Sequence, residues 1–347
     1  MSSNPYTIIF GKEPAQMIER PVQLDQIISD FTAEEPSSQA YVITGVRGSG
    51  KTVSMTRIAE EMSRRKDWIV LDLNPEEKIE EQIAGKLASI PSLSVLFTKA
   101  EINLSLLGFG VSLKSAPPIS NINAAVERML AVIKKEGKRL LITIDEVTNN
   151  EYIRVFAHSF QSYIRAKEPV FLLMTGLYEN ISSLQDEKSL TFLYRTPKVF
   201  LRPLNLAAIT ASYQKTFEIS SQKAQEMAVL TGGYAFAFQV LGYLCWQNKP
   251  EKIEDILPQY DQYLQEYVYE KIWSELSAKD QSILRVMAEG IKENKTIRER
   301  LGMSSGLMSV YRKRLKEKGI IDTPARGQMV IILPRFDAFI QMMPEDD

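Results

Sequence analysis

The stretch AYVITGVRGSGKT (residues 40–52) joins an apolar, β-rich run to a glycine-rich turn that ends in Lys-Thr. The turn matches the pattern G-x-x-x-x-G-K-[ST] at Gly45, Gly50, Lys51 and Thr52. Its glycines let backbone N–H groups close around phosphate oxygens, Lys51 can reach the outer phosphates, and the Thr52 hydroxyl can bind Mg²⁺. Apolar residues at helical spacing follow the turn. The stretch therefore predicts a strand, a phosphate-binding loop and a helix.

Length and composition limit the class of protein. At 347 residues the chain is long enough for two or three domains, and 44% of its residues are apolar. The net charge of −1 excludes a nucleic-acid-binding field over the whole surface, so any basic patch must be local. No apolar run reaches the roughly 20 residues of a membrane span, and we expect no membrane partner.

Cysteine and histidine are each present once. Cys245 lies in an apolar stretch, where we expect a buried thiol; a single cysteine also excludes a disulfide framework and fits a cytoplasmic protein. His158 falls off the apolar stripe of its predicted helix, so we expect it to be exposed. One histidine excludes a histidine-based triad and a site with several histidine ligands.

Four further apolar runs predict strands, and helical patterns lie between them. The runs are WIVLDL (68–73), RLLITID (139–145), VFLLMTG (170–176) and KVFLRPL (198–204). Continuous apolar strands alternating with helices indicate an α/β fold with a five-stranded parallel sheet whose ligand lies at the carboxyl ends of the strands. A short helix is predicted over 20–31, and the alternation in EINLSLLGFGVSLKS (101–115) predicts a hairpin.

Polar residues at the ends of these strands are the candidates for catalysis. Asp145 would hold Mg²⁺, mostly through water, and Glu146 would orient and activate the attacking water. Thr175 ends the fourth strand, where a hydroxyl can touch that water or the γ-phosphate. Arg195, which is better placed than Arg202, could stabilise charge on the γ-phosphate. The alternatives are an acidic strand cap, an ordinary strand-end threonine and a surface arginine.

From about residue 205 the strand pattern ends, and helices are predicted over about 70 residues. Residues 276–347 then show a helix, a short helix, a turn, a third helix over 307–321 and a short strand, which is the order of a winged helix. We therefore predict three domains: a P-loop ATPase core (1–205), an α-helical lid (206–275) and a C-terminal winged helix (276–347).

The third helix and the following turn carry a local basic patch. Residues 291–326 contain ten Lys or Arg and four Asp or Glu, so 10 − 4 gives +6. The pattern places Leu307, Val310, Tyr311 and Leu315 on the inward face. The residues expected to face out and contact DNA are Ser305, Ser309, Arg312, Lys313, Lys316 and Arg326. The alternative is a solvated basic face on a module that contacts protein.

The order and spacing of these motifs resemble the AAA+/STAND ATPases, specifically the bacterial and archaeal ATPases related to replication initiators of the origin-recognition type. IERPVQLDQI (18–27) resembles the box that borders the adenine, residues 45–52 and LLITIDEV (140–147) the two Walker motifs, and LYRTPKVFLRPLN (193–205) the arginine-bearing segment before the lid. The resemblance implies strand order 5-1-4-3-2, a lid over the nucleotide and a C-terminal winged helix. Expected ATP contacts are Gly45, Val46, Arg47, Gly48, Ser49, Gly50, Lys51, Thr52 and Arg20.

Two departures from the family pattern concern the lid. STAND members usually carry Gly-x-Pro there, whereas this chain has TGGYAFAFQ (231–239) with Ala235 at the proline position. The same helix lacks an Arg or Lys that could serve as a second sensor. Slow hydrolysis follows, which suits a switch better than a motor.

Two functions remain open on these grounds. The first is an ATPase with Mg²⁺ as cofactor, whose ATP or ADP state sets its engagement of DNA, with nucleotide-dependent homo-oligomers as a further expectation. The second is a STAND signalling ATPase whose winged helix mediates autoinhibition or binds a protein partner. A plain P-loop kinase would leave the lid and the winged helix without a purpose.

Overall fold

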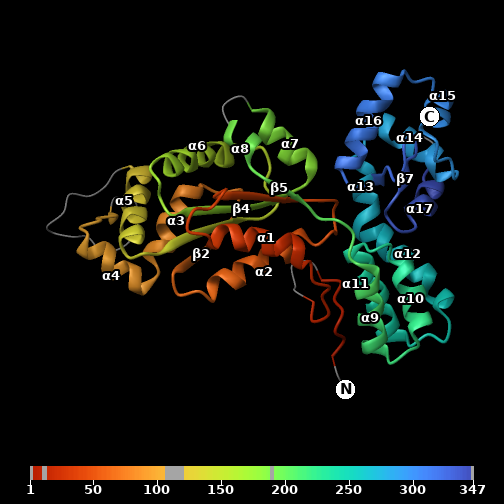
Figure 1. The fold of residues 1–347 in the computed structure, drawn as a ribbon, viewed down its shortest axis with the longest axis horizontal. Coiled ribbons are helices and arrows are strands. Elements are labelled where there is room, and N and C mark those ends of the chain that lie inside the picture. The colour runs from red at the N-terminus through yellow and green to blue at the C-terminus, as the bar shows by residue number, and fades with distance from the viewer. Residues whose placement is uncertain (1–2, 10–13, 106–120, 188–190, 345–347) are drawn as a thin grey trace. The chain divides into compact units, whose positions relative to one another are not determined.

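The computed structural model describes residues 3–9, 14–105, 121–187 and 191–344 (Figure 1). By contacts the chain divides into two units. The sheet unit contains Pro21–Thr44 and Ser54–Phe200, and the helical unit contains Met1–Arg20, Gly45–Val53 and Leu201–Asp347. The phosphate loop therefore belongs by contacts to the helical unit. The three-domain division stays a prediction.

Five parallel strands form the sheet in the order β2-β3-β4-β1-β5, which confirms both the fold class and the predicted order 5-1-4-3-2. Their register places the end of β1 beside the ends of β4 and β5, with Ile43 opposite both Thr175 and Val199. The strands are β1 (Ala40–Thr44), β2 (Trp68–Leu73), β3 (Arg139–Ile144), β4 (Val170–Gly176) and β5 (Lys198–Phe200).

Helices cover the sheet because its central strands are apolar on both faces; every residue of β1 and β4 is buried. One apolar cluster joins strands to α3, α5 and α6. Phe31 of α1 instead packs on aromatic rings of three strands, Tyr41, Trp68 and Phe171. The helices are α1 (Pro21–Thr32), α2 (Lys51–Ser63), α3 (Ile79–Ala88), α4 (Pro91–Lys99), α5 (Ile122–Lys135), α6 (Glu151–Arg165), α7 (Tyr178–Asp186) and α8 (Thr191–Arg195).

The first part of the helical unit is the predicted lid region. Its helices share one apolar cluster with the C-terminal elements and with Tyr6 near the N-terminus. Gly242 of α11 lies directly against the Tyr6 ring, which leaves no room for a Cβ at this position. The elements are α9 (Leu206–Phe217), α10 (Ser221–Leu230), α11 (Ala235–Asn248), η2 (Ile253–Ile256), α12 (Leu257–Leu264), a π-helical turn η3 (Gln265–Tyr269) and α13 (Glu270–Ser274).

The C-terminal part has the order of a winged-helix-like domain. Buried Asp280, 1% exposed, accepts hydrogen bonds from the Arg314 guanidinium and so ties α14 to α16. The elements are α14 (Ala278–Ala288), α15 (Asn294–Arg300), α16 (Ser305–Glu317), β6 (Ile321–Asp322), β7 (Val330–Ile331), which pairs antiparallel with β6, and α17 (Phe336–Met342). None of the helices that the structure describes is long and apolar enough to cross a membrane.

Cys245 is buried and His158 is exposed, as expected. Residues 106–115 of the predicted hairpin lie outside the described residues, and residues 101–105 form no strand. The predicted inward face of the third helix was right for Leu315, which is buried, and for Tyr311, which packs on the apolar cluster, but wrong for Leu307 and Val310, which are exposed. Met308 is buried in their place, because the partner helices rather than the local pattern set the rotation of α16.

Candidate nucleotide site

The phosphate loop connects β1 to α2, and its glycines adopt conformations that other residues avoid. Gly48 has φ +74° and Gly50 has φ +92°, both in the left-handed region. A Cβ on Gly48 would collide with the hydroxyl of Tyr234, so the loop backbone lies directly against the start of α11. Glycine is therefore needed at Gly48 for close contact with the lid as well as for the turn.

Three successive carbonyl groups of the loop accept hydrogen bonds from elsewhere in the helical unit. The Tyr234 hydroxyl donates to the carbonyl of Arg47, and the N–H of Phe236 donates to that of Gly48 at 3.1 Å. Arg20 donates from Nη2 to the carbonyl of Ser49 at 3.0 Å. Burial raises the pKa of Tyr234 far above its usual range, so this hydroxyl keeps its proton and acts as a donor. Residues of the helical unit therefore hold three carbonyls of the loop in place.

Arg20 also donates to the carbonyl of Arg202, which links the predicted adenine-side box to the segment leading into the lid. Burial lowers the pKa of the Arg20 guanidinium to about 10, so it remains protonated at neutral pH. The structure thus brings the predicted nucleotide contact Arg20 to the loop, as a support of the loop backbone.

Lys51 is nearly buried, and its ammonium group points back to the loop. Nζ donates to the carbonyls of Gly45 and Val46, each at 3.1 Å. The Ser49 hydroxyl oxygen is buried and has no hydrogen-bond partner among the residues that the structure describes. Because α2 begins at Lys51, the positive end of its helix dipole lies at the loop. A nucleotide phosphate would fit here, because the loop offers the Lys51 ammonium group, the unsatisfied Ser49 hydroxyl and the start of α2, which includes Thr52.

The loop also contacts the C-terminal part of the helical unit. Arg47 pairs with Glu275, the residue after α13, at 3.1 Å, and both side chains are about one-third exposed. Gly319, between α16 and β6, lies against Val46: a Cβ there would be 3.5 Å from the Val46 Cβ. Val46 itself packs on the apolar cluster of the helical unit. Two loop residues are therefore in contact with the segments that flank and form the winged-helix-like domain.

The acidic end of β3 lies in the sheet unit. Thr175, fully buried at the end of β4, donates its hydroxyl hydrogen to Asp145 Oδ1. Its oxygen accepts the N–H of Glu146 at 3.1 Å. Glu146 is exposed and has φ 51°, a left-handed conformation that costs energy for a residue other than glycine. Strained residues concentrate at functional sites. Thr175 therefore positions both acidic residues.

Arg195, the other catalytic candidate, is the last residue of α8 and is exposed in the sheet unit. It has the exposure that an arginine acting on a neighbouring subunit's nucleotide would need, and also that of an ordinary surface arginine. Lys51, Thr52 and the rest of the loop belong to the helical unit, whereas Asp145, Glu146 and Thr175 belong to the sheet unit.

Most of the candidate DNA-binding side chains are exposed, and some of them also have partners within the domain. Ser305, Ser309, Lys313, Lys316 and Arg326 are exposed, and Lys313 pairs with Glu317 at 3.9 Å. Lys316 pairs with Asp322 at 3.2 Å, and the Ser305 hydroxyl accepts a hydrogen bond from Arg298. Arg312 was expected to face out, but it is half-buried. The rotation of α16 that buries Met308 also turns Arg312 toward the domain.

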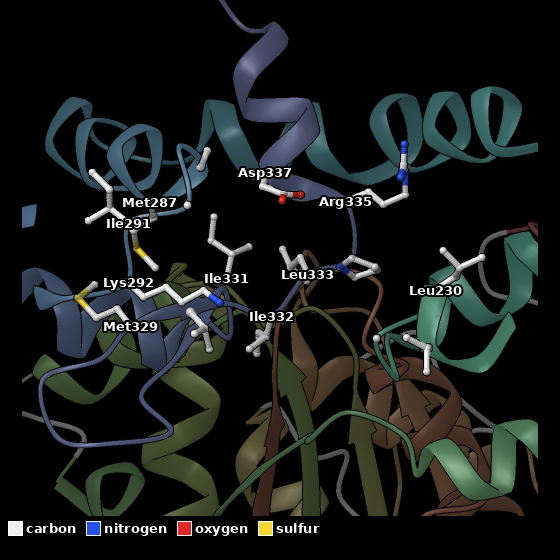
Figure 2. A pocket seen from close by; sticks show the side chains of 16 residues that line it. Leu230, Met287, Ile291, Lys292, Met329, Ile331, Ile332, Leu333, Arg335 and Asp337 are labelled. Carbon is white, nitrogen blue, oxygen red and sulfur yellow. The ribbon is translucent and has the colours of Figure 1, made fainter. Parts of the chain in front are cut away.

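A separate hollow of about 470 Å³ lies between the ends of α10 and α14 and the segment from β7 to α17 (Figure 2). Apolar side chains form most of its lining, and Lys292, Arg335 and Asp337 add charge. The Arg335 guanidinium is already paired with both carboxylate oxygens of Asp261. The described lining contains no residue of the phosphate loop, so this hollow is distinct from the nucleotide site.

Sequence reasoning missed two residues that act on the loop. Tyr234 lies in TGGYAFAFQ, the segment singled out for its missing proline, and a tyrosine beside two glycines was the available signal. Glu275 had no such signal, because its partner Arg47 is 228 residues away in sequence.

Comparison with known proteins supports the fold. Residues 266–340 match a family model described as a domain of unknown function, DUF8462. No curated protein matches the chain. Among solved structures, a Walker-type ATPase of Pyrococcus abyssi is similar at 16% identity over 94% of this chain and 96% of that one, with a TM-score of 0.63. At this identity the match shows the fold alone.

Two weaker matches have TM-scores below 0.5. Cdc6p from Pyrobaculum aerophilum is 16% identical over 94% of each chain, with a TM-score of 0.48. The ORC2 protein of Aeropyrum pernix is 15% identical over 92% of this chain and 91% of that one, with a TM-score of 0.49. The match to the Pyrococcus abyssi structure shows that the chain has the fold of a Walker-type P-loop ATPase, and it confirms the resemblance drawn from the motifs at the level of the fold.

Proposed function

We propose that this protein is an ATP-binding switch that hydrolyses ATP slowly and whose nucleotide state controls DNA binding by the winged-helix-like domain. The contacts of Arg47 with Glu275 and of Val46 with Gly319 carry the proposal. A phosphate in the loop must compete with the carbonyls of Gly45 and Val46 for Lys51. Binding therefore rearranges the loop at the residues that contact the C-terminal segments.

The chain's own residues fit slow ATP hydrolysis. Mg²⁺ bound with ATP supplies positive charge beside the transferred phosphoryl group, and Thr52 and Asp145 are the residues that would hold it. Glu146 would orient the attacking water, while Thr175 keeps the Asp145 carboxylate and the Glu146 backbone in place. The structural match to a Walker-type ATPase supports ATP as the substrate.

Arg195 would add charge stabilisation in the transition state, from the same or a neighbouring subunit. The absence of Arg and Lys from α11 supports a low rate, because this helix of the lid region supplies no cation for the γ-phosphate.

The DNA contact would be weak in a monomer. With Arg326 and the two ion-paired lysines, Lys313 and Lys316, as phosphate contacts, the log–log salt dependence of binding should have a slope near −3. Sequence-specific recognition would then require nucleotide-dependent oligomers or a partner, which increase the number of simultaneous contacts.

The test is duplex-DNA binding by fluorescence anisotropy at several salt concentrations, with ATP, with ADP and without nucleotide. We expect salt-dependent binding that changes with nucleotide and is lost in a Lys313→Glu/Arg326→Glu variant. Glu275→Gln should reduce the difference between nucleotide states, whereas Glu254→Gln, on an exposed glutamate away from the loop, should not. Salt-dependent binding that is indifferent to nucleotide would overturn the switch.

A second candidate is a signalling ATPase whose winged-helix-like domain mediates autoinhibition or binds a protein partner. The hydrogen bonds from the chain to three loop carbonyls favour this second candidate. They hold the loop in a resting arrangement that an incoming signal could release. Failure to bind duplex DNA in every nucleotide state, together with a protein partner retained at high salt, would select this candidate.

A further inference from the structure

The outward face of α16 carries apolar side chains that the fold does not use. Val310 is 61% exposed and Leu307 is 42% exposed, three residues apart and hence neighbours on one side of the helix. The helix packs instead through Met308 and Leu315, both fully buried. We call Gly306, Leu307, Ser309, Val310 and Lys313 the reading face.

Neither packing nor backbone conformation explains why glycine occupies position 306 on the same face. A Cβ built on it meets nothing within 4 Å, and its φ is not in the left-handed region. Glycine inside a helix is less stable than alanine, so the fold would tolerate and even prefer a side chain here. Four residues before Val310, a missing side chain lets another molecule approach the helix backbone closely.

The charge around the reading face selects an anionic partner. The Lys313 side chain lies three residues after Val310 and is 76% exposed, although it pairs with Glu317 at 3.9 Å. Ser309 and the turn residue Arg326 are exposed as well. Duplex DNA matches this mixture, because its major groove admits a helix, its edges carry phosphates, and thymine contributes an apolar C5-methyl group to the groove.

We infer that the reading face of α16 recognises thymine C5-methyl groups in the major groove through Val310 and Leu307. The inference rests on the proposed DNA-binding function and names the bases that the domain prefers. Lys313 would contact the adjacent phosphate backbone, and Gly306 would let the helix sit deep enough for the two aliphatic side chains to reach the methyl groups.

The experiment compares duplexes of a few helical turns that are identical except that deoxyuridine replaces thymidine, which removes only the C5-methyl groups. Full-length protein is titrated with each duplex by fluorescence anisotropy at low salt. A second pair, of G·C duplexes with cytosine or 5-methylcytosine, adds a methyl group at the same ring position. We expect tighter binding to the methylated member of each pair, by roughly fourfold for each methyl group buried.

Variants of the reading face can separate contacts with the DNA bases from contacts with the phosphate backbone. Val310→Ala and Leu307→Ala should bring the thymine-to-uracil ratio toward one while salt dependence persists. Val95→Ala, on a valine 56% exposed in α4, removes the same atoms elsewhere and should leave the ratio unchanged. Lys313→Gln should weaken binding to both duplexes alike and reduce the salt slope by about one.

The outcomes distinguish this inference from the function on which it rests. Equal binding to the thymine and uracil duplexes, or a ratio that survives in Val310→Ala/Leu307→Ala, overturns methyl recognition and leaves DNA binding standing. Binding to no duplex in any nucleotide state overturns the DNA-binding function and this inference with it, and leaves a protein as the partner of the exposed face.

Discussion

The phosphate loop and the acidic end of β3 contain the two sets of residues that are expected to act on ATP, and different parts of the chain support them. The carbonyls of Arg47, Gly48 and Ser49 are bonded to the lid and to Arg20, far away in sequence. Asp145 and Glu146 are instead bonded to Thr175 on the adjacent strand. The acids are thus arranged by the sheet, whereas the loop is arranged by the helical unit.

Under the proposed function, this difference predicts a separate task for each of the two regions. A carboxylate supported by the sheet keeps its geometry whatever the lid does, which is what hydrolysis requires. A loop supported by the lid changes its contacts when the lid changes, which is what a switch requires. Variants in the two regions should therefore affect different measurements.

Glu146→Gln should have the largest effect, on hydrolysis alone. Loss of the carboxylate that activates water should lower the rate by about 10²–10⁴-fold while ATP affinity stays within about twofold. Phosphate release measured in single turnover, beside equilibrium binding of a fluorescent ATP analogue, separates the two quantities. Glu151→Gln at the exposed start of α6 is the control. A variant that loses affinity and rate together would contradict the division of tasks.

Lys51→Ala should act on binding. Its ammonium group is nearly buried in the loop and is the charge expected to meet the outer phosphates, so its removal should cost on the order of 2–5 kcal/mol of ATP-binding free energy. Isothermal titration calorimetry measures this, with Lys66→Ala as the exposed control. ATP binding that survives in Lys51→Ala would remove the loop from the nucleotide site.

Thr175→Val should slow hydrolysis about tenfold with little change in ATP affinity, because Asp145 and Glu146 lose a shared hydrogen-bond partner. Burial of the unpaired groups should also lower the free energy of unfolding by about 1–3 kcal/mol. Thr143→Val is a matched control: this buried β3 hydroxyl bonds Asp72 at 2.9 Å, so stability should fall while the rate does not. Equal loss of rate in both variants would reduce Thr175 to a structural residue.

Tyr234→Phe should have the smallest effect and the opposite sign. Removing the hydroxyl frees the Arg47 carbonyl from the lid, so ATP should bind more tightly by about 1 kcal/mol, roughly fivefold. Tyr260→Phe is the control, because it removes a buried hydrogen bond of 3.1 Å to the carbonyl of Leu230 and leaves the loop alone. Weaker or unchanged ATP binding in Tyr234→Phe would show that this contact does not restrain the loop.

Much of the sheet and of the candidate site could be predicted because the relevant signals are local. Each buried strand is a continuous apolar run, and β2 and β4 begin and end where the sequence predicted. The loop pattern and the Asp-Glu pair lie within a few residues each. The order of helices and strands in the C-terminal part could also be predicted from the sequence, and it fits a winged-helix-like domain.

Rotation of α16 shows where local reasoning fails. Two faces of this helix carry apolar residues at helical spacing, one that includes Leu307 and one that includes Met308. Nothing in the segment itself shows which of the two faces is buried. The same problem affects its basic residues: Arg314 pairs with buried Asp280, 34 residues away, while neighbouring Lys313 points to solvent. Packing against α14 decides between the alternatives.

The sequence alone was enough to predict the α/β fold with its phosphate loop and the Asp-Glu pair at a strand end, because each of these signals lies within a few neighbouring residues; the strand order came from the family resemblance. Only the tertiary structure decided what holds the loop. Tyr234 and Arg47 are separated by 187 residues, and Glu275 and Arg47 by 228. Contacts of that range depend on how whole helices pack, and that packing connects the loop to the segment that starts the winged-helix-like domain.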